Sequence, residues 1–201
     1  MSHEMPATGS GAEDPRTLLD MGIAASMADR PAQALALFAQ AAAAAPTWAL
    51  PHFLLGSEYA AQSDIGNAEA ALANAVLLDP ELHIARYQLG LLQFSSGRAA
   101  AALVTWQPLS ALEGLQGLPA FVRGFAAMAQ DDFAGAKQHF HAGLAQADIN
   151  AAVAGDIRKV LADVEALRVP GVASAPAPVQ PAEISSTAHV LVSAYDKYKL
   201  H

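Results

Sequence analysis

Apolar residues recur through residues 15–168 at three- and four-residue intervals, which places them on one face of an α-helix. Short clusters of polar residues and helix breakers interrupt this pattern. The clusters are Ala28–Pro31, Ser63–Gly66, Ser95–Arg98 and Gln130–Asp132. The alternation predicts a series of helix pairs. The first helix is expected to begin near Pro15, with Asp14 as its N-cap.

A constant interval links these helix pairs. The residues that recur on it are Gly22, Gly56, Gly90 and Gly124; Ala34, Ala68, Ala102 and Ala136; and the bulky Phe38, Leu72, Trp106 and Phe140. We expect the small residues to let two helices cross closely and the bulky residue to fill the space beside the crossing. Pro46 and Pro80 are expected to end second helices. Such self-similarity is the signature of a repeat architecture.

The third unit departs from the pattern. It carries Pro108 inside its second helix, which is expected to kink or shorten that helix. The stretch Leu109–Pro119 contains Gly114 and Gly117 and is interpreted as a loose connection. The array is therefore expected to bend or hinge between the third and fourth units.

Three further segments follow the repeats. Residues 149–168 carry one apolar stripe, and we interpret them as a capping helix that closes the last unit. Residues 169–184 form a Pro- and Ala-rich linker. Residues 185–201 are amphipathic and predict a helix, with a short strand through His189–Ser193 as the alternative. Residues 1–14 are expected to be disordered.

These landmarks resemble the tetratricopeptide repeat (TPR) family, whose pattern is Leu-Gly-x-x-Tyr, then Ala-x-x-x-Phe, then Pro. The unit at 49–82 matches best, with Leu55, Gly56, Tyr59, Ala68 and Pro80. The other units are expected at 15–48, 83–116 and 117–150. The resemblance implies an all-α protein: a right-handed α-solenoid of four helix pairs, with a C-terminal capping helix and a tail helix.

In TPR proteins the first helices line a concave groove that binds peptides, and the resemblance implies the same here. The residues at these positions are mostly apolar: Leu19, Ile23, Met27, Leu50, Phe53, Ser57, Ile84, Tyr87, Leu91, Phe94, Leu118, Phe121, Phe125 and Met128. The Lys, Asn and Arg clamp with which some members hold chaperone C-termini is absent. Bacterial secretion chaperones built from this repeat are a closer analogy, at the level of the fold.

The residues alone also indicate this surface. Tyr87, Leu91 and Phe94 are expected to point away from the partner helix, yet all are apolar. The first helices of the third and fourth units are thus hydrophobic nearly all round, which is typical of helices covered on both sides. A single aromatic residue such as Phe94 is more often part of a core, so the interpretation depends on the set as a whole.

Composition narrows the function further. The net charge of −8 argues against a nucleic-acid binder, which needs a basic face. The chain has no cysteine, which excludes disulfides and cysteine nucleophiles. Neither a signal peptide nor a membrane span is expected, and the composition fits a cytoplasmic protein.

No pattern indicates an enzyme, a metal site or a cofactor. His139 and His141 lie two residues apart, whereas helical metal ligands lie three or four apart. Asp131 and Asp132 are interpreted as a solvated capping pair. No phosphate-binding loop or nucleophile elbow is present.

Two functions remain open. The first is an adaptor or chaperone-like module that binds an apolar or amphipathic peptide segment in the groove. The second is a self-assembling subunit whose groove is filled by its own or a neighbour's C-terminal segment. That segment offers Leu191, Val192, Tyr195 and Tyr198, and the linker reaches on the order of 40 Å if extended. A helix on the outer surface and a disordered recognition tail are the other possibilities for this segment.

Overall fold

The computed structural model describes residues 14–112, 117–146 and 149–166. Residues 1–13, the predicted linker and the amphipathic segment 185–201 lie outside the described residues. The described part of the chain is helical, without a strand. Its helices are α1 (Pro15–Met27), α2 (Pro31–Ala44), α3 (Ala49–Ala61), α4 (Ile65–Leu78), α5 (His83–Ser95), α6 (Ala99–Ser110), α7 (Gly117–Met128), α8 (Phe133–Leu144) and α9 (Ala151–Ala166).

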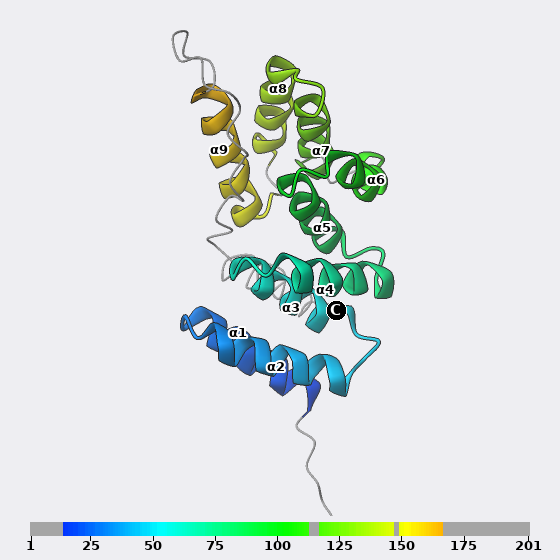
Figure 1. The fold of residues 1–201 in the computed structure, drawn as a ribbon, viewed down its shortest axis with the longest axis vertical. Coiled ribbons are helices and arrows are strands. Elements are labelled where there is room, and N and C mark those ends of the chain that lie inside the picture. The colour runs from blue at the N-terminus through cyan, green and yellow to red at the C-terminus, as the bar shows by residue number, and fades with distance from the viewer. Residues whose placement is uncertain (1–13, 113–116, 147–148, 167–201) are drawn as a thin grey trace, which may run out of the picture.

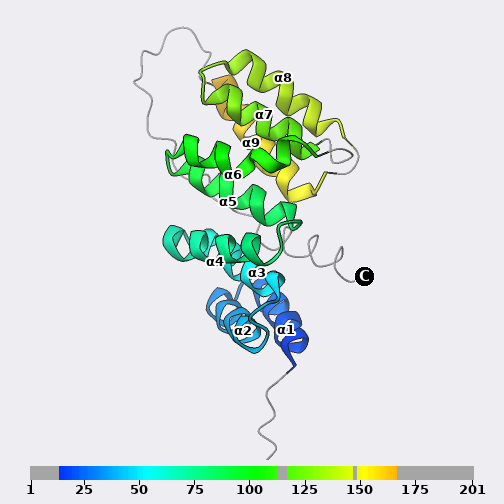
Figure 2. The ribbon, with the colours of Figure 1, turned by 90° about the vertical axis from the view of Figure 1, so that its right-hand side faces the viewer.

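The helices pack as successive pairs along the long axis of the molecule (Figures 1 and 2). Helix α1 packs on α2, α3 on α4, α5 on α6 and α7 on α8, and each pair contacts the next. The first helices begin at Pro15, Ala49, His83 and Gly117, on the same constant interval as the glycines. The predicted all-α solenoid of helix pairs is therefore confirmed.

The repeating glycines lie where the two helices of each pair cross. A Cβ atom built on Gly22 would lie 2.6 Å from the ring of Phe38, and one on Gly56 would lie 2.8 Å from Leu72. In the third and fourth pairs the same atom would collide with Trp106 and Phe140. The expected role of the small residues is confirmed, because each bulky residue occupies the volume that its glycine leaves free.

The turn inside each pair contains one residue in the left-handed backbone region. These residues are Asp29, Ser63, Gly97 and Asp131, with φ of 55°, 59°, 76° and 58°. They recur on the interval of the repeat, a regularity hidden in the sequence because only one of them is glycine. The side chains at the other three sites cost stability, since an L-residue in this region meets its own backbone.

Ser63→Gly is expected to stabilise the chain by about 0.5–1 kcal/mol, because glycine adopts a φ of 59° without that cost. Thermal unfolding measured by circular dichroism checks this. Ser96→Gly is the matched control, since Ser96 has an ordinary φ of −82° and donates a hydrogen bond to the Leu92 carbonyl. A Ser63→Gly variant no more stable than the parent would contradict the assignment of strain.

Aspartate side chains cap three of the helices. Asp14 accepts a hydrogen bond from the Thr17 amide at the start of α1, as predicted. Asp64 and Asp132 do the same for α4 and α8. The interpretation of Asp132 as a capping residue is confirmed, whereas its neighbour Asp131 forms the left-handed turn.

Helix α6 is shorter than the second helices of the first two pairs and as long as α8. Helices α2 and α4 each span 14 residues, whereas α6 and α8 each span 12, and α6 ends two residues after Pro108. Helix α8 has the same length as α6 and contains no proline, so the length of α6 does not reveal an effect of Pro108, and the predicted kink or shortening stays a prediction. The predicted loose connection at 109–119 was too long: Leu109 is a buried residue of α6, and Pro119 belongs to α7.

Two hydrophobic clusters form the core, and α5 contributes to both. Leu89 and Leu92 of α5 belong to the first cluster, together with residues of α1 to α4. Tyr87 of α5 belongs to the second cluster, together with residues of α6 to α9. The second cluster runs through the α6–α7 junction, where the sequence predicted a bend. Across the division, Arg98 donates two hydrogen bonds to Glu69 of α4, at 2.8 and 2.7 Å. This guanidinium holds the pKa of Glu69 below its ordinary value.

Helix α9 lies alongside α7 and α8 (Figures 1 and 2). It begins at Ala151, which follows Gly117 by the repeat interval. Helix α9 therefore occupies the position that the first helix of a fifth pair would have. Val153, Ile157 and Leu161 of its apolar stripe are buried in the second cluster. Arg158 of α9 occupies the position that glycine holds in the four pairs, and it is exposed because no helix in the described part of the chain crosses α9 there. These features fit the expected capping helix.

Candidate peptide-binding groove

The fourteen predicted groove residues fall into three groups by exposure. Eight are buried: Leu19, Ile23, Leu50, Phe53, Ser57, Tyr87, Phe121 and Phe125. Five are half-buried: Ile84, Leu91, Phe94, Leu118 and Met128. Met27 is exposed at 59%. The half-buried residues all belong to α5 and α7, so the accessible apolar positions concentrate in the third and fourth pairs.

The aromatic residues of α5 contact its partner helix. Tyr87 and Phe94 both stack on Trp106 of α6, with ring centroids 6.1 and 6.0 Å apart. The indole N–H of Trp106 also donates to the Tyr87 carbonyl at 2.9 Å. The expectation that Tyr87 and Phe94 point away from α6 is therefore wrong. Trp106 is large enough to reach both side chains across the crossing at Gly90.

Helix α9 contacts α8, and its apolar residues belong to the same core cluster as buried groove positions of α5 and α7. Tyr87 and Phe121 share one cluster with Ile157 of α9. Burial raises the pKa of the Tyr87 phenol, and the carboxylate of Asp156 on α9 raises it further. Burial likewise raises the pKa of Asp156. The sequence predicted a cover for this surface from a partner, another copy or the tail, and part of that cover is α9.

A chain of polar contacts joins successive first helices. The Ser26 hydroxyl of α1 donates to Glu58 Oε2 of α3 at 2.8 Å. The neighbouring Ser57 hydroxyl donates to Gln88 Oε1 of α5 at 2.7 Å. Glu58 is only 4% exposed. Sequence reasoning missed Glu58, although it is the one charged residue of α3 and so stands out in an otherwise apolar helix.

No family model and no curated protein matches the chain. Among solved structures, a crystal structure of MamA matches with a TM-score of 0.58 at 19% identity, over 77% of this chain and 84% of that one. The MamA RS-1 ArsTM double mutant matches at 0.58 and 15% identity, over 95% and 99%. A further MamA crystal structure matches at 0.56 and 17%, over 93% and 96%. MamA is a TPR-containing protein. The chain has a TPR-like fold.

At these identities the likeness to MamA extends to the fold alone. No helix of the TPR-like fold, within the ranges that the structure describes, is long and apolar enough to cross a bilayer. The expected cytoplasmic location and the analogy to bacterial secretion chaperones stay predictions.

The buried carboxylate of Glu58 makes the stability of the TPR-like fold depend on pH. Burial raises the pKa of Glu58, with Asp29 adding to the rise, and the Ser26 hydrogen bond opposes both. A raised carboxyl pKa means that the folded chain holds the proton more tightly than the unfolded chain. Stability from this group is therefore fully present below the ordinary glutamate pKa of about 4.3 and is lost as pH rises through the folded value.

Glu58→Gln is expected to raise the melting temperature at pH 7 by about 2–4 °C, the shift that about 1 kcal/mol produces in a chain of this size. Glutamine keeps an acceptor for Ser26 and removes the buried charge. The gain should shrink as the pH falls towards 4. Glu81→Gln is the control, because the Glu81 side chain is 85% exposed. A Glu58→Gln effect that is the same at every pH would rule out this account.

Proposed function

We propose that the chain is a non-catalytic protein-interaction module, an adaptor or chaperone-like protein that binds an apolar or amphipathic peptide segment. The TPR-like fold supports the class of function. The observation that carries the proposal is the group of half-buried apolar side chains on neighbouring first helices. These are Ile84, Leu91 and Phe94 on α5 and Leu118 and Met128 on α7.

The bound segment is expected to be apolar on the side that meets α5 and α7. Each half-buried side chain has part of its surface in water, and a ligand that covers this surface gains about 25 cal/mol per Å² before ordering costs. All five of these side chains are apolar. An apolar helix face therefore fits them better than a charged peptide.

Selection from a library of amphipathic peptides tests the proposal. Peptides enriched on the parent chain are expected to bind a Leu91→Ser/Leu118→Ser variant at least tenfold more weakly, because two apolar contacts are lost. Affinity is measured by fluorescence anisotropy, after circular dichroism has established that the variant is folded.

The matched control is Leu77→Ser/Val104→Ser, which changes two side chains that are 79% and 75% exposed on second helices. Binding to this control should equal binding to the parent chain. The proposal fails if no enriched peptide distinguishes the two double variants, or if the control loses binding instead.

Self-assembly through the C-terminal segment is the alternative function. One observation favours contact between copies: α2 and α6 contain no charged residue, so their outer faces lack like-charge repulsion. A concentration-dependent oligomer that disappears on deletion of residues 183–201 would support this function. A chain that stays monomeric at all concentrations would support the adaptor function.

A further inference from the structure

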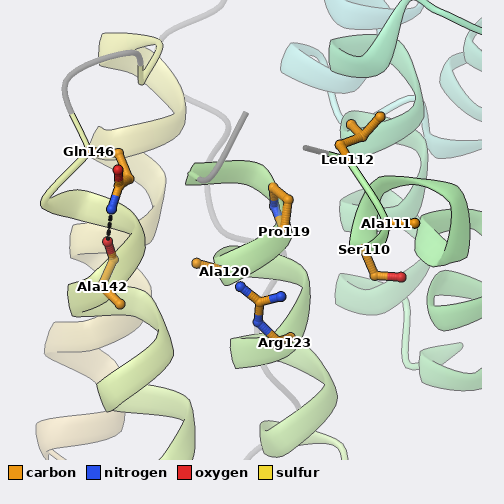
Figure 3. Close-up of a pocket in the computed structure, with 8 residues that line it drawn as sticks. All are labelled: Ser110, Ala111, Leu112, Pro119, Ala120, Arg123, Ala142 and Gln146. Atoms are coloured by element: carbon orange, nitrogen blue, oxygen red, sulfur yellow. Dashed lines mark hydrogen bonds between the residues drawn. The ribbon is translucent and has the colours of Figure 1, made fainter. Parts of the chain in front are cut away.

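A pocket of about 340 Å³ opens between the end of α6, the first turns of α7 and the end of α8. Figure 3 shows Arg123 of α7 between the end of α6 on one side and α8 on the other. The residues of this α6–α8 pocket are Ser110, Ala111, Leu112, Pro119, Ala120, Arg123, Ala142 and Gln146. Among these described residues, Arg123 is the one charged group.

The pocket lies on the opposite side of α7 from the predicted groove. Phe121 and Phe125 are four residues apart and share the groove face, whereas Arg123 is about 200° from each of them around the helix. A ligand in the pocket is therefore separate from a peptide on the groove face.

Arg123 breaks the repeat at this place. The same position of the other first helices holds Met21, Leu55, Leu89 and Ile157, all apolar. Leu89 is buried in the first cluster, and Leu55 packs against it. Arg123 makes no hydrogen bond or ion pair with any residue in the described ranges. Arg123 itself is exposed, so the packing of α7 places no requirement for an arginine at this position.

The end of helix α6 forms one side of the pocket. Leu112 is the counterpart of Leu78, where α4 ends, but α6 ends earlier, at Ser110. Ser110, Ala111 and Leu112 then line the pocket that Arg123 enters. The arginine that departs from the repeat therefore lies where the end of α6 meets α7.

The surroundings select the charge of a ligand. Arg123 offers one planar fork of N–H donors, which matches one carboxylate. The C-terminal ends of α6 and α8 carry partial negative charge and the first turn of α7 carries partial positive charge, so the helix ends oppose one another and Arg123 sets the sign of the ligand. Leu112, Pro119 and Ala120 provide an apolar wall. The chemistry fits a singly charged carboxylate on a short aliphatic body.

We propose that the α6–α8 pocket binds such a carboxylate through Arg123. Two sources share this chemistry: a free aliphatic acid, and the C-terminus of a peptide that ends in an aliphatic residue. The site is independent of peptide binding on the groove face, so either can fail without the other.

Nuclear magnetic resonance titration of the full chain tests the proposal with three probes: 4-methylpentanoate, acetyl-Ala-Ala-Leu with a free C-terminus, and the same peptide as its amide. Saturable shifts of the Arg123 side-chain resonance are expected with a carboxylate probe and not with the amide. The carboxylate probe that binds with the higher affinity shows whether the pocket takes a free aliphatic acid or a peptide C-terminus.

Arg123→Leu is the decisive variant, because leucine stands at this position in two other units and should leave the fold intact. It is expected to weaken carboxylate binding about tenfold to a hundredfold. Arg123→Lys should be intermediate, since lysine keeps the charge without the fork. Arg158→Leu on α9, outside the pocket, should bind like the parent chain.

Unchanged binding in Arg123→Leu would overturn the proposal, as would equal binding of the amide. A titration without saturation by about 10 mM would also overturn it, because affinity that weak would exclude a specific site.

Discussion

Gly90→Ala is expected to destabilise the chain by about 3 kcal/mol, which lowers the melting temperature by roughly 10 °C. The added methyl group would collide with the indole of Trp106. That ring cannot move aside easily, because it is fully buried, its N–H is bonded to the Tyr87 carbonyl, and it lies 5.0 Å from the ring of Phe125. Thermal unfolding by circular dichroism measures the effect.

Gly155→Ala is the matched control, since it makes the same change inside α9, where a Cβ atom meets nothing within 4 Å. Alanine has the higher helix propensity, so this variant should gain about 0.5–1 kcal/mol. Opposite signs for the two variants are the expected result. A Gly90→Ala variant as stable as the parent would mean that the α5–α6 crossing is looser than described.

Trp106→Ala is expected to cost about 3–5 kcal/mol, the range for deleting a large buried aromatic side chain. The loss removes ring contacts with Tyr87, Phe94 and Phe125 at the centre of the second cluster. Urea unfolding followed by circular dichroism gives the free energy of unfolding. Fluorescence of the remaining Trp48 reports on the first cluster in the same experiment.

Trp48→Ala provides the comparison. Trp48 is half-buried at the edge of the first cluster, so its removal should cost about 1 kcal/mol. The double variant Gly90→Ala/Trp106→Ala should be less destabilised than the sum of its parts, because the methyl group added at position 90 enters the space that the indole leaves. Equal losses for the two tryptophans would contradict the central place given to Trp106.

The helix pairs could be predicted from the sequence because their determinants are local and repeated. Gly56 and Leu72 mark a crossing by size alone, and Asp14 and Pro15 mark a helix start by their capping chemistry. The turns were harder to define. Asp29 and Ser63 take a backbone conformation that favours glycine, and tertiary packing holds them there in spite of their side chains.

The exposure of the groove residues could not be predicted from the same pattern. An apolar residue such as Tyr87 on a first helix can face a ligand or the core, and periodicity alone does not distinguish them. The size of Trp106 and the position of α9 decide the matter, and both depend on residues distant in sequence. Half-buried Leu91 and Leu118 remain the predicted contacts.

Polar residues that depart from the repeat carried information that the family pattern did not use. Glu58 is a lone carboxylate in an apolar helix, and in the structure it is buried with Ser26 as its donor. Arg123 replaces an apolar residue at a fixed register, and in the structure it lines a pocket. A comparison of the units position by position would have singled out both residues.

Site-specific photo-crosslinking in living cells distinguishes binding on the first helices from binding elsewhere on the chain. A benzophenone amino acid replaces Leu91 or Leu118 on the first helices, or Leu77 or Val104 on the second helices as controls. If a peptide segment binds on the face formed by α5 and α7, one protein is crosslinked from positions 91 and 118 and not from 77 or 104. Crosslinks only from the control positions, or equally from all four, would contradict binding on the face formed by α5 and α7.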